Sequence, residues 1–473
     1  MKASADLSVD VHYLGLVETA ELIRRRELSS EQVTAALLKR VGRLDPELNS
    51  FVLVLESTAM EAARAADKEI AAGLWRGPLH GVPVGVKDLL DMAGLPTAAG
   101  GVILKDSVAA SDATVVSRLK RAGAVIIGKL RTTEAALLDH HASLPRPINP
   151  WGAEYWTGVS SSGSGVATAA GLCYGALGTD TGGSIRMPSS ANNLTGLKPT
   201  WGRVSRHGLF PLAESLDHIG PMARNAADAA AMLQAIAGAD PHDPTALAHP
   251  TQDYLGGLGK PIDDIVVGVD WRFVAEGLPT EIESVVKEAC LALQERGAQV
   301  RPVQMPWDPA CDYGSMTILL AEAAHAHAAF FPAEADRYGP RTREFIEEGR
   351  KVDAATYIKA SILRAQFNGR MAKLFREVDV LIAPGLGLPL PTLAELEAIV
   401  ADLDVTTRTL FRFTSPFNMA GLPTLSLPGG FSRDDMPLGL QLVGGKLSEA
   451  LLCQVGHAFQ QITDHHLRRP PLS

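Results

Sequence analysis

The segment 157–188 concentrates serine and glycine in a pattern that suits acyl-transfer chemistry. It begins with TGVSSSGS at 157–164 and continues, after an alanine-rich stretch, with GTDTGGSIRMP at 178–188. Glycines beside a serine allow backbone N–H groups to converge on one point, as an oxyanion hole requires. A flexible Gly/Ser linker is the simpler interpretation, but the apolar helix expected at 166–171 and the IRMP sequence that follows do not fit a linker.

A serine hydroxyl becomes a nucleophile only when a base takes its proton. Lys87 is the candidate base because it follows the apolar run GVPVGV at 81–86, where a solvated lysine would be out of place. Burial lowers the pKa of a lysine ammonium, so a buried lysine can be neutral and accept a proton. The alternative at this point is a structural lysine at the end of a strand, paired with Asp88.

Other catalytic patterns are incomplete in this chain. The elbow G-x-S-x-G has Ser162 in place of its last glycine, Asp180 begins a single D-T-G where aspartic proteases need two, and the S-x-x-K at Ser117 lacks K-T-G and S-D-N partners. His325 and His327 could be two metal ligands, but no third ligand follows at a recognised spacing, and neither H-E-x-x-H nor a Walker A loop occurs. We therefore expect neither a metal nor a cofactor.

Helices that alternate with short apolar strands must position these residues. Ser29 and Gln32 form a capping-box pattern that begins a helix, Asp45-Pro46 is expected to end it, and a second helix is expected over 59–72. Near-continuous Val, Ile and Leu runs predict an α/β fold with a large mixed, mostly parallel sheet core covered by helices on both faces. The expected strands lie at 79–87, 124–129, 265–269, 378–383, 423–427 and 438–443.

The chain divides into four regions that we expect to form one continuous domain. Residues 1–75 form an N-terminal helical region packed on the core, and 76–244 carry the catalytic motifs. Residues 245–400 form a more variable, mostly helical region, and 401–473 complete the core. The variable region is therefore the candidate for a cap over the serine segments.

Composition excludes several classes of function. The 473 residues carry 44 Lys and Arg against 53 Asp and Glu, a net charge of −9, so there is no basic signal for nucleic acid or an anionic membrane. No apolar run is long enough to cross a bilayer, the N-terminus lacks a signal-peptide pattern, and the four cysteines have no metal or disulfide spacing. We expect a cytoplasmic protein with free thiols, a small-molecule substrate and no nucleic-acid or membrane partner.

Several motifs, in order along the chain, resemble those of the amidase signature family, whose members hydrolyse amides with a Ser-Ser-Lys triad. GVPVGVKD at 81–88 is similar to the family's lysine motif, TGVSSSGS at 157–164 to its serine loop, and GTDTGGSIRMP at 178–188 to its nucleophile segment. The resemblance continues through GLKPT at 196–200, LDHIGP at 216–221, NMAGLP at 418–423 and PLGLQLVG at 437–444. It implies the amidase signature fold.

The resemblance also implies a role for each catalytic residue. Ser184 would be the nucleophile, Ser160 the bridging serine held in a cis peptide, and Lys87 the base that deprotonates Ser184 through Ser160. Backbone N–H groups would form an oxyanion hole, and three neighbouring residues would support it. The oxyanion donors would be Thr181, Gly182, Gly183 and Ser184, and the supporting residues Ser161, Asp180 and Arg186.

Two features depart from the family pattern. Val159 and Ser162 stand where the serine loop usually carries glycine, and Phe411 stands where glutamine-using members carry an acidic residue. Phe411, Phe413 and Phe417 together predict an apolar or aromatic substrate pocket, with simple core packing as the alternative.

The resemblance implies an amidase that cleaves a small-molecule amide, such as an aryl amide, anilide or hydrazide, through an acyl-enzyme. Family members are often dimers, so we expect a homodimer. One alternative is the A subunit of a glutamine-dependent tRNA amidotransferase, against which Phe411 and the missing basic signal count. Another is a non-catalytic binding protein on the same scaffold, against which the intact Lys87, Ser160 and Ser184 count.

Overall fold

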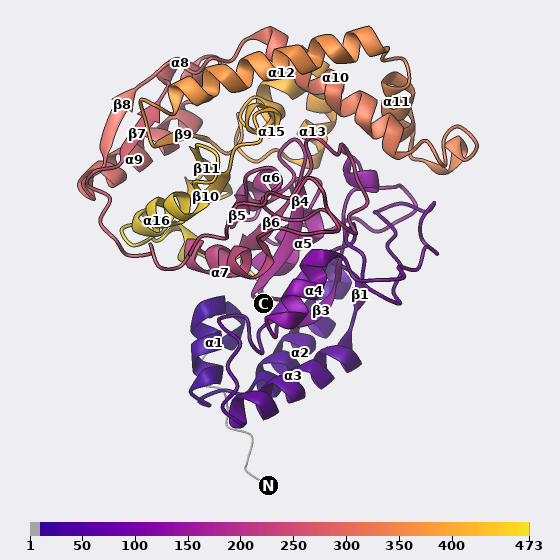
Figure 1. Cartoon of the computed structure of the whole chain (residues 1–473), viewed down its shortest axis with the longest axis vertical. Coiled ribbons are helices and arrows are strands. Elements are labelled where there is room, and N and C mark those ends of the chain that lie inside the picture. Colours follow the sequence, from indigo (N-terminus) through magenta and orange to yellow (C-terminus); the bar gives the residue numbers. More distant parts are fainter. Residues whose placement is uncertain (1–9, 473) are drawn as a thin grey trace.

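The structure, a computed structural model, describes residues 10–472, except for the side chains of residues 403 and 404. These residues form one eleven-stranded sheet with helices packed on it (Figure 1). The strands are β1 (Phe51–Val54), β2 (Pro83–Lys87), β3 (Val125–Leu130), β4 (Gly175–Asp180), β5 (Thr195–Lys198), β6 (His218–Ala223), β7 (Val266–Val269), β8 (Gln299–Pro302), β9 (Val380–Pro384), β10 (Thr424–Phe431) and β11 (Pro437–Gly444). Their order across the sheet is β1-β3-β2-β4-β6-β5-β10-β11-β9-β7-β8.

Parallel and antiparallel pairs both occur in this sheet. β2 pairs in parallel with β3 and β4, and β7 pairs in parallel with β8 and β9. The six other pairs are antiparallel. The mixed α/β class is confirmed, but the parallel pairs are fewer than expected. The reason is that a near-continuous apolar run indicates a strand covered on both faces, whatever the direction of its neighbours.

Helices cover both faces of the central strands, as expected. Ser426 of β10 faces Ser190 of α6 (Arg186–Ala191), with their hydroxyl oxygens 3.4 Å apart. The adjacent side chains Leu425 and Leu427 instead pack around Gly456 of α16 (Glu449–Gln460). Because successive side chains of a strand point to opposite faces, α6 and α16 lie on opposite sides of the sheet.

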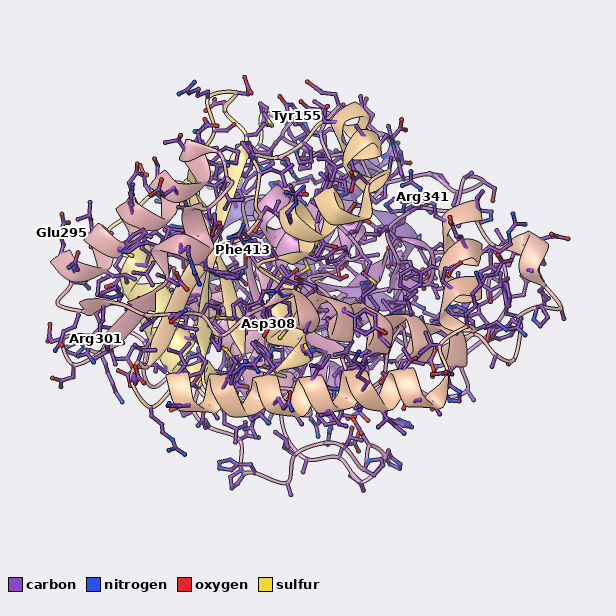
Figure 2. All side chains as sticks on the ribbon, turned by 90° about the horizontal axis from the view of Figure 1, so that it is seen from above. Tyr155, Glu295, Arg301, Asp308, Arg341 and Phe413 are labelled. Atoms are coloured by element: carbon purple, nitrogen blue, oxygen red, sulfur yellow. The ribbon has the colours of Figure 1, made fainter. Side chains whose placement is uncertain are left out.

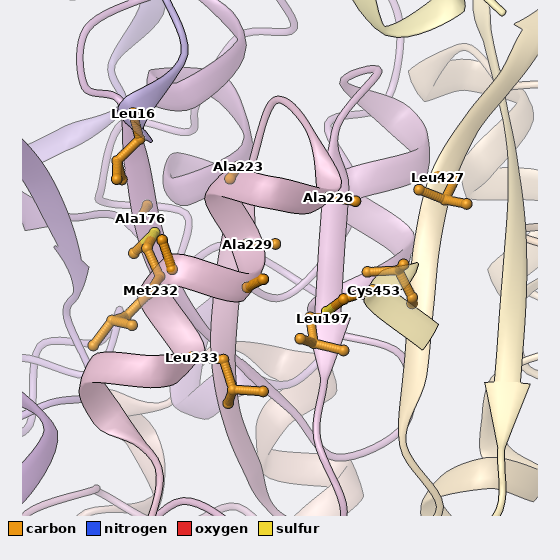
Figure 3. Close-up of a cluster of buried hydrophobic side chains, with 14 of the residues drawn as sticks. Leu16, Ala176, Leu197, Ala223, Ala226, Ala229, Met232, Leu233, Leu427 and Cys453 are labelled. Atoms are coloured by element: carbon orange, nitrogen blue, oxygen red, sulfur yellow. The ribbon is translucent and has the colours of Figure 1, made fainter. Parts of the chain in front are cut away.

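The main buried cluster joins both halves of the chain on the α16 side. Figure 3 shows Met232 and Leu233 of α7 (Ala226–Ile236) beside the strands that carry Ala176 and Leu197, with Cys453 of α16 next to Leu197. All five side chains are buried. This core fixes the positions of β4 and β5, the strands that flank the segment 181–194.

The N-terminal region is helical, as expected, but adds one strand. It contains α1 (Leu16–Arg24), α2 (Ser30–Leu48) and α3 (Glu56–Ala71), and β1 pairs with β3. Ser29 and Gln32 form the predicted capping box. The predicted helix end at Asp45-Pro46 is wrong, because α2 continues through Pro46 and ends before Asn49, whose φ of 54° is left-handed.

The remaining helices include an arch over the central strands (Figure 1). The arch consists of α10 (Pro309–Ala326), α11 (Pro340–Gly349) and α12 (Ala354–Leu374), and α13 (Leu393–Val400) lies outside it. Region 245–400 thus provides helices above the core, but it also contributes β7, β8 and β9 to one edge of the sheet. The other helices are α4 (Thr114–Arg121), α5 (Ser162–Ala169), α8 (Trp271–Ala275), α9 (Thr280–Glu295), α14 (Leu403–Thr406), α15 (Ser415–Met419) and the short turns η1 (Val11–Tyr13), η2 (Glu134–Ala136), η3 (Ala335–Arg337), η4 (Thr407–Phe411) and η5 (His465–Leu467).

Candidate active site

Lys87 lies at the end of β2 in the middle of a cluster of hydroxyl groups. Its Nζ lies 2.7 Å from Ser160 Oγ and 2.8 Å from both Ser161 Oγ and Thr179 Oγ1. All four side chains are buried. The sequence predicted the approach of Lys87 to Ser160, and the structure brings these two residues together.

The charge of Lys87 is not balanced by its sequence neighbour. Asp88 Oδ1 lies 2.7 Å from Nζ of Lys129 on β3, so the alternative of a Lys87–Asp88 ion pair is wrong. Burial lowers the pKa of Lys87 well below its ordinary value, and the negative charges of Asp180 and Asp217 oppose that shift only in part. The side-chain amine of Lys87 is therefore suited to be uncharged.

The serine loop is fixed by backbone contacts on both sides of Ser160. The Val159–Ser160 peptide bond is cis, as the resemblance implies. The carbonyl oxygen of Ser160 accepts hydrogen bonds from Thr132 Oγ1 at 3.0 Å and from the N–H of Thr133 at 3.2 Å. The N–H of Ser161 donates to the carbonyl oxygen of Ser184 at 3.3 Å. The loop that carries Ser160 is thus tied directly to the residue expected to be the nucleophile.

The turn that carries Ser184 is built around the buried carboxylate of Asp180. This carboxylate accepts hydrogen bonds from the N–H groups of Gly183 at 2.9 Å and Ile185 at 3.0 Å, and it forms an ion pair with Arg186 at 3.0 Å. Burial alone would raise the pKa of Asp180, but the charge and hydrogen bonds of Arg186 hold it well below its usual range. Asp180 therefore stays ionised and fixes the turn.

The four expected oxyanion donors are not equally available. The N–H of Gly183 points at Asp180, and one N–H bond directed at a carboxylate cannot also point at a substrate oxygen. Gly183 is thus a correction to the expected set. Within residues 10–472, the N–H groups of Thr181, Gly182 and Ser184 have no hydrogen-bond partner. These three N–H groups are the candidates that the structure leaves for an oxyanion hole.

Sequence reasoning did not assign Asp217 and Asn418 to the site. Asp217 holds the side chain of Thr181, and Asn418 holds the turn that carries Ser184. Asp217 Oδ1 accepts a hydrogen bond from Thr181 Oγ1 at 2.5 Å, and burial raises the pKa of Asp217 to about 6. Asn418 Nδ2 donates to Asp180 Oδ1 at 2.8 Å, while its Oδ1 accepts from Arg186 at 2.5 Å. The motifs LDHIGP and NMAGLP contain these residues, and that was the available signal.

Two threonines that sequence reasoning did not assign to the site complete its surroundings, and of these Thr179 lies within the motif GTDTGGSIRMP. Thr179 provides the third hydroxyl around Lys87, and Thr414 Oγ1 donates to the carbonyl oxygen of Gly182 at 2.6 Å. Thr414 lies within the phenylalanine-rich segment 411–417, so this contact links that segment to the nucleophile turn.

Ser184 lies on the wall of a cavity of about 580 Å³, the main cavity, between the catalytic segments and helices of the arch. Ser184 itself is 9% exposed, unlike the fully buried Lys87 and Ser160. The lining is mostly apolar, and its polar groups include the ion pair Arg341–Asp139. The apolar lining residues are Ala136, Leu137, Leu138, Val159, Met187, Leu212, Met316, Leu319, Leu320, Phe345, Val400, Ala401 and Phe411.

The three phenylalanines of the expected pocket have different surroundings. Phe411, at the end of η4, lines the main cavity near Gly182. Phe413 is fully buried and meets Phe273 edge-on, with ring centroids 5.0 Å apart, and Phe417 is buried in a separate apolar cluster. The assignment of Phe413 and Phe417 to the pocket is therefore wrong, because their places in the chain turn them into the core.

The histidines considered as metal ligands are engaged elsewhere or lack companions. His327 Nδ1 forms a hydrogen bond with the Tyr338 hydroxyl at 2.9 Å, and burial lowers the pKa of His327 to about 4. Among the described residues, no group of three or more His, Cys, Asp or Glu side chains could hold a metal ion. No helix in the described part of the chain is both long and apolar enough to span a membrane.

Known proteins resemble this chain over almost its whole length. The family model described as Amidase matches residues 32–453. "Putative amidase AmiD" of Mycobacterium tuberculosis is 47% identical over 460 residues, which cover 97% of this chain and 96% of that protein. The A subunit of glutamyl-tRNA(Gln) amidotransferase from Roseiflexus sp. is 38% identical over 490 residues, covering 98% of this chain and 99% of that protein.

A solved structure supports the same assignment. Native peptide amidase from Stenotrophomonas maltophilia superimposes with a TM-score of 0.83 at 30% identity, covering 97% of this chain and 98% of that one. The chain belongs to the amidase family, whose members are the amidase signature enzymes. It is an enzyme that hydrolyses the C–N bond of amides.

Proposed function

We propose that the protein is a stand-alone amidase that cleaves an apolar small-molecule amide through an acyl-enzyme on Ser184. The observation that carries the proposal is the 2.7 Å between Lys87 Nζ and Ser160 Oγ in a fully buried cluster, next to a turn that presents Ser184 to the main cavity. A lysine in contact with hydroxyl groups rather than carboxylates is placed for proton transfer, because the charges of Asp180 and Asp217 only partly offset the effect of burial on its pKa.

The number of protons on the amine of Lys87 determines which hydroxyl group can donate a proton to it. A neutral amine has two N–H bonds and one lone pair, so it donates to two of its three hydroxyl neighbours at most. The Ser161 hydroxyl donates to the carbonyl oxygen of Thr179 at 3.2 Å, which leaves the Ser160 hydroxyl free to donate to the lone pair of Lys87. Once protonated, Lys87 has three N–H bonds for three oxygen acceptors, so the cluster accommodates both states.

The reaction then proceeds in balanced steps. Ser160 passes its proton to Lys87 and takes the proton of Ser184, whose Oγ forms a bond to the amide carbon. When the C–N bond breaks, the leaving nitrogen takes a proton that returns from Lys87 through Ser160. Water then attacks the Ser184 ester by the same relay and releases the acid. No step in this proposal uses a metal or a cofactor.

The developing negative charge is stabilised by backbone N–H groups. We assign this role to Thr181, Gly182 and Ser184, since the N–H of Gly183 is engaged by Asp180. Asp217 and Thr414 act as positioning residues, because they hold the Thr181 side chain and the Gly182 carbonyl. Preorganised donors of this kind contribute about 10²–10³ in rate each.

A second candidate function is the glutamine-using component of a tRNA amidotransferase, which the 38% identical relatives favour. Such a component must bind the ammonium group of glutamine. Phe411 offers no charge for it, and the main cavity is mostly apolar. Hydrolysis of glutamine only in the presence of partner proteins would favour this candidate over a stand-alone amidase.

A panel of substrates tests the proposal directly. The purified protein should hydrolyse apolar aliphatic or aryl amides and leave glutamine intact. A fluorophosphonate or sulfonyl fluoride probe should add its mass to the peptide that contains Ser184. Labelling confined to Ser117 would contradict the assignment. The homodimer expected from the resemblance remains a separate prediction, which light scattering can test.

A further inference from the structure

A second cavity, of about 410 Å³, lies against the main cavity. It does not include Ser184, but it shares six lining residues with the main cavity. The shared set is Leu138, Asp139, Val159, Arg341, Thr342 and Val400. Val159 is bonded directly to Ser160, so the boundary between the two cavities lies one residue from the proposed catalytic relay. A substrate bound at Ser184 can therefore extend toward both cavities.

The second cavity differs from the main cavity in chemistry. Its lining includes the flat side chains of buried Trp156 and half-buried His140 and Tyr155, beside the buried carboxyl group of Glu134, where the main cavity carries mostly aliphatic side chains. Burial lowers the pKa of His140 to about 4, so its ring is uncharged at neutral pH. Arg146 and Glu397 lie at the exposed rim. The three flat side chains suit an aromatic group.

A weak ion pair separates the two cavities. Arg341 Nε and Asp139 Oδ2 are 3.5 Å apart, and their side chains are 44% and 45% exposed. An ion pair with this exposure contributes about 0–1 kcal/mol, so little free energy opposes its opening. The start of α11 is nevertheless anchored, because the N–H of Gly339 donates to buried Glu134 at 2.9 Å. The Arg341 side chain can thus move without displacing its helix.

Figure 2 labels Arg341 and Tyr155, and both lie in the upper half of that view. Arg341 and Tyr155 both line the second cavity. The boundary is therefore formed by α11 on one side and by the segment that leads into the serine loop on the other.

We propose that the two cavities form one substrate site for amides with two arms, an aliphatic arm in the main cavity and an aromatic arm in the second cavity. The Arg341–Asp139 pair is the barrier that the aromatic arm must open. This inference rests on the proposed function, since it assumes that the scissile bond lies at Ser184. It makes Arg341 a specificity-determining residue and names the substrate class as an amide that joins an aliphatic and an aromatic group.

Two variants with opposite expected effects test the inference. The substrates are a series of hexanoyl amides of methylamine, benzylamine and phenylpropylamine, together with the reversed series of phenylalkanoyl hexylamides. Arg341→Ala should raise the ratio of kcat/KM for the aromatic-armed amides to that for the methylamide by about tenfold, because the barrier is removed. Ala142→Trp should lower the same ratio by about tenfold, because Ala142 lines only the second cavity and the indole fills it.

The matched control is Arg343→Ala. Arg343 lies on the same helix, forms an ion pair of the same length, 3.5 Å, with Asp336, and is 41% exposed, but it lines neither cavity. Its substitution should leave the ratio unchanged. If Arg341→Ala and Ala142→Trp also leave the ratio unchanged, the inference is wrong, even where the enzyme remains a Ser184-dependent amidase.

The same experiment separates this inference from the proposed function. Binding of the phenylpropylamide to the Ser184→Ala protein is measured by tryptophan fluorescence, and it should weaken in Ser184→Ala/Ala142→Trp. Loss of binding in the double variant supports the two-armed site even if another residue proves to be the nucleophile. Unchanged binding, with hydrolysis that still depends on Ser184, contradicts the two-armed site alone.

Discussion

Two neighbouring strands each carry a buried lysine at the same end, and these two lysines have opposite surroundings. Lys87 on β2 is 0% exposed and is surrounded by the hydroxyl groups of Ser160, Ser161 and Thr179. Lys129 on β3 is 1% exposed and is paired with the carboxylate of Asp88 at 2.7 Å. The strands are parallel neighbours, and Val86 is in register with Lys129.

The difference between the two sites separates a structural lysine from a chemical one. A carboxylate keeps a buried ammonium charged, because the ion pair compensates part of the lost hydration. Hydroxyl groups provide no net charge, so burial lowers the pKa of Lys87. The same residue type at the same depth therefore serves as a fixed ion pair in one strand and as a candidate base in the next.

The largest effect should come from replacing Ser184, the residue that Lys87 is proposed to deprotonate through Ser160. Ser184→Ala should reduce kcat by about 10³-fold or more, since Ser184 is the serine on the cavity wall that is tied to the Ser160 loop. Steady-state turnover of an apolar amide measures this. Retention of more than about 1% of the wild-type rate would mean that the hydroxyl cluster around Lys87 serves some other purpose.

The two lysines should differ when each is replaced by methionine. Lys87→Met should lower kcat/KM by about 10³-fold with only a modest loss of stability. Lys129→Met should instead cost about 3–5 kcal/mol in the free energy of unfolding, because it leaves the Asp88 carboxylate buried and unpaired. Urea unfolding and amide turnover, measured for both variants, separate the two roles. If Lys129→Met removes activity while stability is unchanged, the distinction between the two sites is wrong.

The pH dependence should follow Lys87. The base must be neutral in the free enzyme, and its pKa is lowered by burial, so activity is lost as the pH falls through that lowered pKa. Below it, kcat/KM should fall about tenfold per pH unit. A profile of kcat/KM against pH from about 4 to 10 measures this limb. Maximal activity below about pH 5 would rule out a lysine base.

The smallest effect should come from replacing phenylalanines. Phe411 lines the main cavity, whereas Phe413 lies in the core. Phe411→Ala enlarges the main cavity and should change the ratio of kcat/KM for bulky and small amides by about tenfold. Phe413→Ala should cost about 3–5 kcal/mol of stability, because Phe413 is a core residue, and should leave that ratio unchanged. Competition between paired substrates measures selectivity, and thermal unfolding measures stability. Equal changes in selectivity for both variants would contradict the division.

Local patterns in the sequence determined the elements and the motif residues. The capping box at Ser29, the strand that ends at Lys87 and the glycine-rich turn before Ser184 depend on neighbouring residues, so they can be found from the sequence alone. The apolar runs likewise predicted most of the longer strands. Short or glycine-containing strands such as β4 and β5 were not predicted, because their few residues give no clear period.

Contacts between distant segments were decided only by the tertiary structure. The sequence placed Asp88 beside Lys87, but its partner is Lys129, and Thr414 contacts Gly182 across 232 positions. Which phenylalanine lines the cavity and which N–H is taken by Asp180 depend on how these segments pack. The physical reason is that burial and charge act through space, so the partner of a buried group is set by the fold and not by its neighbours in the chain.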